Sequence, residues 1–285
     1  MKNNNIEVQP VSNSVGAQIK GVDLAEPLTA FAYKKIRKAL CEWGVLFFRQ
    51  QNLTPEQHVA FGKRFGGLHL SKTIGKVPGH PLVAEVRKEP NQKRNIGGNW
   101  HTDHSFAEIP PLGSILVARE LPDKGGDTLF ANMSSAYDNL SKGMKITLQG
   151  LSAVHAKQKA LQSTNLSKDR QVSRKELEQM GDAVEEQYVH PVVVKHPETG
   201  RKILYLNPTY SVRFEGWTEQ ESKPLLQFLF EEASSPENTC RFHWDNGSVV
   251  FWDNRTVWHY AINDYHGKKR VLHRVSVEGS KVSAT

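Results

Sequence analysis

The sequence predicts a mainly β protein with peripheral helices, arranged as a sandwich or a barrel. Short runs of β-branched and aromatic residues recur along the 285 residues, and only a few helical segments separate them. Two pairs of runs flank turn-forming residues, at Pro197 to Gly200 and at Asp245 to Gly247, so each pair is expected to form a hairpin. Strands and helices do not alternate strictly, which disfavours a doubly wound parallel sheet.

Capping patterns mark the helix starts. Thr54-Pro-Glu-Gln combines a hydroxyl cap, a proline at the first helical position and a glutamine three residues on, ahead of Phe61 and Phe65 on one face. The remaining expected elements are helices that start at Ser173 and Thr218, a helix from about Tyr33 to Trp43 that ends at Gly44, and strands at Val45 to Phe48, Ser114 to Val117, Val192 to Val194, Ile203 to Leu206, Cys240 to Trp244, Ser248 to Trp252 and Arg270 to Val277.

The composition indicates an ordinary globular protein. With 38% hydrophobic and 24% charged residues it can bury a core, and we expect one domain over residues 11–285 behind a flexible tail at residues 1–10. No signal-peptide pattern and no membrane-length apolar run occur, so a cytoplasmic location without membrane contact is expected. The net charge is +7, but the basic residues do not form the dense stripe of a nucleic-acid binder. The excess of basic residues either attracts small acidic substrates or simply lies on the solvated surface.

Two further features have simple interpretations. Cys41 and Cys240 match neither a redox pair nor a zinc knuckle, so buried free thiols are expected. The polar segment 157–187 lies between strand-like segments, and such an insertion is either a lid over a binding site or a solvated surface excursion.

The segment Asn99 to Phe106 carries the first candidate metal ligands. His101 and Asp103 are two residues apart, so on an extended strand both side chains point to one face. They supply two members of the 2-His-1-carboxylate triad that binds Fe(II) and leaves three positions open. Taken alone, the pair is weak evidence, because a single histidine such as His101 is more often packed in a core than bound to a metal. His104 is expected to point to the opposite face, toward the second layer of residues around the metal or the substrate channel, and is not assigned as a ligand.

A second segment near the C-terminus strengthens the metal hypothesis. His259 can supply the third ligand, and Arg270 and Arg274 follow on one face of an expected strand, ~13 Å apart at ~3.3 Å per residue. Two inward-facing arginines are costly unless each meets an anion, as a dicarboxylate cosubstrate and an acidic substrate would provide. The alternative is that both form surface salt bridges. His273, on the other face, is expected to be packed.

Together these residues resemble the taurine/2-oxoglutarate dioxygenase family (TauD/TfdA), which includes chlorophenoxyalkanoate and alkylsulfate dioxygenases. The resemblance extends from about Gly16 to about Gly279 and rests on four motifs in the family's order: Trp100-His-Thr-Asp103, Gly125-Gly-Asp-Thr-Leu129, Trp252-Asp-Asn-Arg255 with His259, and Arg270 with Arg274.

The resemblance implies a fold, a reaction and residue roles. The fold would be a double-stranded β-helix, a jelly-roll or cupin-like barrel, with Fe(II) held by His101, Asp103 and His259. Thr128 and Arg270 would hold the distal carboxylate of 2-oxoglutarate, and the chain would assemble as a homodimer or homotetramer. Oxygen (O2) would convert 2-oxoglutarate to succinate and carbon dioxide while a substrate C–H bond is hydroxylated.

The departures from the family pattern concern the primary substrate. Arg274 would meet its anionic head, with Tyr210, His69, Gly97 and an apolar residue near Leu161 around it. Taurine enzymes of the family have a histidine where this chain has Ser71 and an asparagine where it has Gly97. Taurine is therefore disfavoured, and an aryloxyalkanoate, a sulfonate or a sulfate ester is expected.

Two other hypotheses use the same residues. A zinc-binding barrel protein or hydrolase would favour four ligands and would leave Arg270 and Thr128 without a partner. A catalytically silent relative would act as a binding module. Trp100 and Trp252 are expected to be core or cavity wall.

Overall fold

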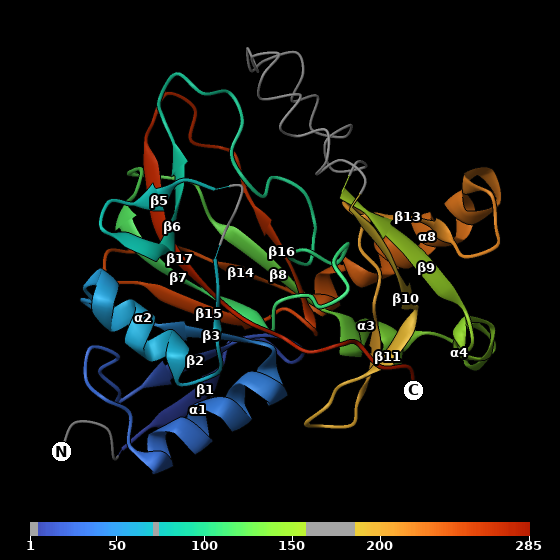
Figure 1. Ribbon diagram of the computed structural model, residues 1–285, viewed down its shortest axis with the longest axis horizontal. Helices are drawn as coiled ribbons and strands as arrows, with labels where there is room; N and C mark the ends of the chain where they lie inside the picture. The colour runs from blue at the N-terminus through green and yellow to red at the C-terminus, as the bar shows by residue number, and fades with distance from the viewer. Residues whose placement is uncertain (1–4, 71–73, 158–185) are drawn as a thin grey trace.

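A computed structural model describes residues 5–70, 74–157 and 186–285. Its largest unit is a nine-stranded sheet (Figure 1), and the mainly β class with peripheral helices is confirmed. The strand order is β1-β2-β3-β15-β7-β17-β6-β5, with β4 paired to β17. The strands are β1 (Glu7–Pro10), β2 (Ala17–Lys20), β3 (Val45–Phe48), β4 (Leu68–His69), β5 (Lys76–Val77), β6 (His80–Lys88), β7 (Gly113–Glu120), β15 (Val249–Asp253) and β17 (Arg270–Val277).

Both faces of this sheet are buried, because alternate side chains of β3 join a hydrophobic cluster on each side of it. Leu46 and Phe48 point toward helices α1 (Ala30–Trp43) and α2 (Pro55–Lys63) and join the core cluster that includes Ile36 and Phe61. Their neighbours Val45 and Phe47 point the other way, into a second cluster. The outer face is therefore closed by helices, and the inner face must be closed by another layer.

That layer is a three-stranded sheet of order β14-β8-β16, which contributes Phe130, Phe242 and Val257 to the inner cluster. Its strands are β8 (Thr128–Asn132), β14 (Thr239–Phe242) and β16 (Val257–Ala261). Two facing sheets with a shared core form the expected barrel, and the inward side chains near its mouth are available to build a site.

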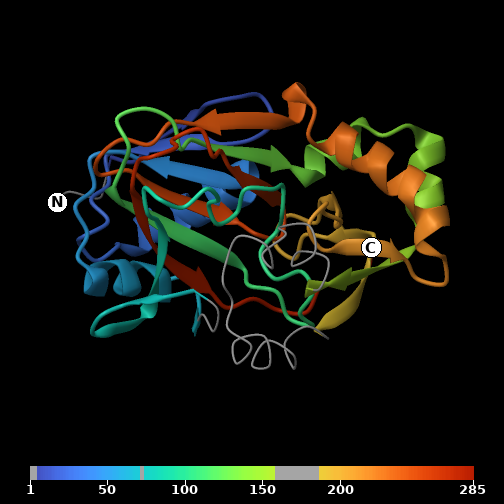
Figure 2. The same cartoon turned by 90° about the horizontal axis from the view of Figure 1, so that it is seen from above.

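A third cluster joins the remaining elements beside the barrel, which Figure 2 shows from above. Trp258 of β16 belongs to it, so it is continuous with the small sheet. Its elements are helices α3 (Met133–Asn139), α4 (Lys142–Leu148) and α8 (Glu219–Ala233), the 3-10 helix Pro236–Asn238, and strands β9 (Ser152–Ala156), β10 (Gln187–Pro191), β11 (Val193–Lys195), β12 (Lys202–Leu204) and β13 (Ser211–Phe214).

Most predicted local structure is confirmed. Thr54 and Thr218 make complete capping boxes, and α1 ends at Gly44, whose φ of 72° suits glycine. The helix expected at Ser173 and residues 158–185 of the segment expected to be a lid lie outside the described residues. Residues 7–10, expected in a flexible tail, instead form β1 and pair with β2.

One hairpin is confirmed and one is wrong. The turn at Pro197 to Gly200 joins the antiparallel pair β11 and β12. The turn at Asp245 exists, since Ser248 N–H donates to its carbonyl, but β14 pairs with β8 while β15 pairs with β3 and β7. The chain therefore crosses from the small sheet to the large one at this turn, which is how a barrel corner is made.

The two cysteines are free; Cys240 is buried as predicted, whereas Cys41 is only half-buried. Among the described helices, none has the length and apolar character needed to cross a bilayer.

Candidate active site

The three predicted ligands meet at one end of the barrel. His101 and His259 form an isolated antiparallel bridge with two backbone hydrogen bonds of 2.9 and 3.2 Å. The Nε2 atoms of both rings lie 3.8 Å from Oδ1 of Asp103, and the three potential ligand atoms lie within 4.8 Å of one another. The convergence is as predicted, but the strand geometry is wrong for Asp103, which lies in a turn.

Asn254 holds that turn. Its Oδ1 accepts a hydrogen bond of 2.7 Å from the backbone N–H of Asp103, and its Nδ2 donates to the carbonyls of Asp103 and Pro111. Asn254 is 1% exposed, so these bonds compete with no water. The asparagine occurs in the motif Trp252 to Arg255, but nothing in the motif itself indicated that its amide fixes a metal ligand.

The electrostatics suit a divalent metal. Burial lowers the pKa of His101 and of His259, so both imidazoles are neutral and keep a lone pair for coordination. Burial by itself would raise the pKa of Asp103, but the charge of the Arg274 guanidinium outweighs it, and the pKa falls well below its usual value.

Hydrogen bonds to His101 and Asp103 determine which of their atoms face the metal position. Nδ1 of His101 bonds the carbonyl of Asn99 at 2.8 Å, which leaves Nε2 for a metal. Oδ2 of Asp103 is occupied by Arg274 and Ser114, which leaves Oδ1 facing the imidazoles. Two neutral nitrogens and one carboxylate oxygen on one side of a shared point are the donor set of non-haem Fe(II), and the residues present fit that metal.

Arg270 is a buried cation with unused donors. It is 4% exposed, and its Nε and Nη2 have no hydrogen-bond partner in the described part of the chain. The rings of Trp244 and Tyr265 lie 5.5 and 5.9 Å from its guanidinium carbon, and a Cβ at Gly126 would lie 3.1 Å from its Cδ and Nε. The surface salt bridge considered for this arginine is wrong; its burial calls for an anionic ligand.

Thr128 lies beside that arginine on β8. Its hydroxyl accepts a hydrogen bond of 3.0 Å from Nε1 of Trp244, the same indole that flanks Arg270. The indole N–H fixes one lone pair of the hydroxyl, so its proton remains to be donated elsewhere. The two residues expected to hold the distal carboxylate are therefore neighbours around one tryptophan.

Arg274 connects the metal ligands to a pocket. Its Nη2 donates to Oδ2 of Asp103 at 2.6 Å, and its Nε donates to the hydroxyls of Ser114 and Ser276 at 3.1 Å. The surface salt bridge considered for it is wrong as well, because the pair is buried. The pocket is lined by His69, Ile74, Leu82, Ala84, His104, Arg274 and Ser276.

The other expected substrate residues surround the same region. The ring of Tyr210 packs against Phe106 at 5.1 Å, and burial, followed by the Asp103 charge, raises the pKa of its phenol. A Cβ at Gly97 would lie 3.2 Å from Cε1 of His101, so a side chain at this position would press on the His101 ring. Ser71 and Leu161 lie outside the described residues.

His104, which was considered for the second layer of residues around the metal or the substrate channel, lines the pocket. It adopts a φ of 50°, and this turn directs its ring toward His69, 5.6 Å away, instead of to the far side of a strand. His273 packs as predicted, with its Nδ1 3.0 Å from Nε of Arg119 on the other face of β17. Trp252 lies against His259, with ring centroids 4.4 Å apart, so it is part of the site wall.

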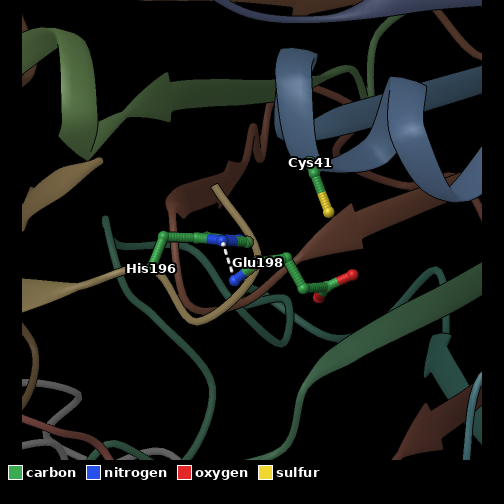
Figure 3. A group of neighbouring side chains, drawn as sticks. All are labelled: Cys41, His196 and Glu198. Carbon is green, nitrogen blue, oxygen red and sulfur yellow. Dashed lines mark hydrogen bonds between the residues drawn. The ribbon is translucent and has the colours of Figure 1, made fainter. Parts of the chain in front are cut away.

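A second group of possible ligands, Cys41, His196 and Glu198, is structural (Figure 3). Nδ1 of His196 accepts the backbone N–H of Glu198, and its Nε2 bonds Asp253 at 3.1 Å, so neither nitrogen is available. Glu198 pairs with Arg255, and burial raises the pKa of Cys41 to about 12. This network anchors the turn after β15 that carries Asn254.

Comparisons with known proteins agree with this geometry. Residues 7–276 match the family described as taurine catabolism dioxygenase TauD, TfdA family. The chain is 34% identical to an alkylsulfatase of Acinetobacter baylyi over 96% of its own length and 85% of that protein. It is 33% identical to an alpha-ketoglutarate-dependent sulfate ester dioxygenase of Pseudomonas putida, over 96% and 90%. A taurine dioxygenase structure from Burkholderia xenovorans superposes with a TM-score of 0.82 at 37% identity, over 98% and 93%.

Proposed function

Because the chain belongs to the TauD, TfdA family and is therefore an Fe(II)- and 2-oxoglutarate-dependent dioxygenase with a jelly-roll fold, we propose that it oxidises a small organic acid bound by Arg274. The observation that carries the proposal is the contact of Arg274 with both Asp103 and the pocket. An anion on this arginine brings its carbon chain next to the metal ligands. The zinc hydrolase and silent-relative hypotheses gain no support from the relatives.

Each residue has a defined task in this proposal. His101, Asp103 and His259 hold Fe(II), and bound iron supplies the activation of O2 that oxidises a C–H bond. Arg270 and Thr128 take the distal carboxylate of 2-oxoglutarate, which satisfies the unused guanidinium donors. The barrel walls, among them Trp252 and Phe130, exclude water around the ligand rings.

A sulfate ester fits the substrate side of the pocket. Ile74, Leu82 and Ala84 supply an apolar wall for an alkyl chain, while Arg274 supplies a cation for the sulfate group. Two relatives act on this class by name. Hydroxylation of the carbon that bears the sulfate gives a hemiacetal-like ester, which breaks its C–O bond to release an aldehyde and hydrogen sulfate. Sulfonates and aryloxyalkanoates are the other acids to compare.

The absence of taurine-type groups supports the same choice. Gly97 offers no side chain where taurine enzymes of the family have an asparagine amide, so a substrate amine finds no partner there. The homodimer or homotetramer, the cytoplasmic location, the single domain and the lid at 157–187 stay predictions.

The test measures succinate formation and substrate loss together. Anaerobic protein with Fe(II) and 2-oxoglutarate should show the weak visible charge-transfer absorption of the chelate. On addition of O2, succinate formation should rise with an alkyl sulfate and should match the sulfate released one to one. Equal stimulation by taurine, or sulfate release without consumption of 2-oxoglutarate, would contradict the proposal.

A further inference from the structure

Lys88, the last residue of β6, is a buried cation that the site described above does not use. Its side chain is 2% exposed. The ammonium lies 4.2 Å from the centre of the Tyr265 ring and makes one long hydrogen bond of 3.5 Å to the carbonyl of Tyr265. Within the described ranges no carboxylate pairs with it, and burial lowers the pKa of its ammonium. An ammonium has three donors, so most of its hydrogen-bonding capacity is unused.

The register of the sheet places Lys88 beside Arg270. The two residues are directly opposite each other on the antiparallel strands β6 and β17, so their side chains share a face. The same face carries Ala84 opposite Arg274 and Val86 opposite Leu272, and these residues line the pocket or the inner core. Lys88 therefore points into the barrel, next to the arginine.

Both cations converge on one ring. The guanidinium carbon of Arg270 lies 5.9 Å from the centroid of Tyr265, and the Lys88 nitrogen lies 4.2 Å from it. Two carboxylates act on Arg270, but Asp127 bonds Arg241, and Asp264 accepts the backbone N–H of Gly126. Arg270 therefore has the Tyr265 phenol as its side-chain partner, and in the described residues neither Arg270 nor Lys88 is bonded to a carboxylate, so an anion between these two buried cations would offset the cost of their burial.

We propose that Lys88 and Arg270 together bind the distal carboxylate of 2-oxoglutarate. The inference rests on the proposed function for the role of Arg270 and adds a second cation to it. A carboxylate has two oxygens and about four lone-pair sites, enough for a guanidinium, the Thr128 hydroxyl and an ammonium. Selectivity for a 2-oxo diacid over a 2-oxo monoacid would then depend on two positive charges.

The competing explanation is structural. In that case the Lys88 ammonium only stacks on Tyr265 and closes the end of β6. The two explanations differ in ligand-free stability. A lysine that only packs should stabilise the protein, whereas an ammonium kept for a ligand should destabilise the ligand-free protein because it is buried without its partner.

The test uses Lys88→Met, which keeps the length and apolar stem of the side chain. Titration calorimetry of the Mn(II)-loaded protein would measure the Kd of 2-oxoglutarate and of 2-oxopentanoate, which has the same chain without the distal carboxylate. The loss of one charge-assisted hydrogen bond should raise the Kd of 2-oxoglutarate about 10- to 100-fold. The Kd of 2-oxopentanoate should stay unchanged.

Three controls make the result specific. Lys268→Met removes an exposed lysine that pairs with Asp123 and should leave both Kd values unchanged. Lys88→Arg keeps the charge and should retain most of the affinity for the diacid. The ligand-free Lys88→Met protein should melt at a higher temperature than the wild type; should it fail to fold, Lys88→Gln serves for the same Kd comparison.

The outcomes separate this inference from the proposed function. If wild-type protein binds 2-oxoglutarate and the neutral variant binds it equally well, Lys88 is not a ligand and the inference is overturned alone. Equal weakening for the diacid and the monoacid, or a lower melting temperature, would favour the structural explanation. Failure of the wild type to bind 2-oxoglutarate would overturn both proposals.

Discussion

At single positions of the site, the space left by a missing side chain is as important as the chemistry of a side chain. Gly97 has a φ of 80° and carries no side chain at the point where one would meet the ring of His101. That ring cannot easily move, since its Nδ1 bonds Asn99 and its backbone pairs with His259. The glycine therefore contributes by leaving a ligand in position, in addition to removing a polar group from the substrate side.

We expect Gly97→Ala to weaken metal binding. A Cβ would press on Cε1 of His101 from 3.2 Å, so the imidazole must shift by a few tenths of an ångström, and Co(II) affinity should fall about tenfold. The matched control is Gly79→Ala. Gly79 has a similar φ of 77° but nothing within 4 Å of its Cβ position.

Both variants should lose roughly 1 kcal/mol of folding stability from the left-handed backbone. Only Gly97→Ala should change the Co(II) titration, followed by visible absorption. The same loss of metal affinity in both proteins would show that backbone strain, and not contact with His101, is responsible.

In the proposed function, strand β17 carries both the residue that binds the cosubstrate and the residue that binds the substrate. Its inward face carries Arg270 and Arg274, and its outward face carries His273, which bonds Arg119. The alternation along one strand fixes the distance between the two arginines, so the two anions proposed to bind them would be held at a fixed separation. This division of roles along a strand can be tested by removing each arginine in turn.

Arg270→Ala should raise the 2-oxoglutarate concentration for half-maximal succinate formation at least 100-fold, because it removes a buried bidentate partner. Arg274→Ala should lower kcat/KM for the acidic substrate by a similar factor while the 2-oxoglutarate requirement changes less than about threefold. Because Arg274 also bonds Asp103, Fe(II) affinity is measured in parallel. Equal effects of both variants on both compounds would contradict the division.

The elements differ in how well the sequence predicted them, and the reasons are physical. Helices with local caps, such as those at Thr54 and Thr218, were predicted because the signal lies within four residues. The corner at Asp245 was mistaken for a hairpin, since a turn of that composition does not reveal which strands it will pair. The short strand β8 was not predicted; its residue Thr128 was noted only because it lies in the motif Gly125 to Leu129.

For the whole molecule, the order of the site residues along the chain predicted which residues belong to the site. Their contacts with one another could not be predicted. His101, Asp103 and His259 could be predicted as one set, yet the link from Arg274 to Asp103 joins residues 171 positions apart and depends on the barrel closing. Lys88 had no motif at all. Its importance follows from its register against Arg270, which only the assembled sheet supplies.

The buried histidines make stability of the whole molecule depend on pH. His58 of α2 is 0% exposed, with Nε2 3.1 Å from the carbonyl of Ile115, and burial lowers its pKa to about 3. Below its ordinary pKa of about 6.5 the unfolded chain binds a proton there and the folded chain does not. The contribution of His58 is therefore intact above pH 6.5 and is lost as pH falls toward 3, at roughly 1.4 kcal/mol per pH unit.

His58→Gln should make this loss shallower, because the amide can still donate to Ile115 but takes up no proton. Urea unfolding of the metal-free protein between pH 6 and pH 4.5 should show a slope about 1 kcal/mol per pH unit smaller than that of the wild type. His266→Gln changes an exposed histidine and should leave the slope as it was. An unaltered slope in His58→Gln would mean that His58 already takes up its proton in the folded state. Acid sensitivity would then have to come from other groups whose pKa is shifted in the folded protein, among them His190, whose pKa is lowered by burial, and Glu198, whose pKa is lowered by Arg37 and Arg255.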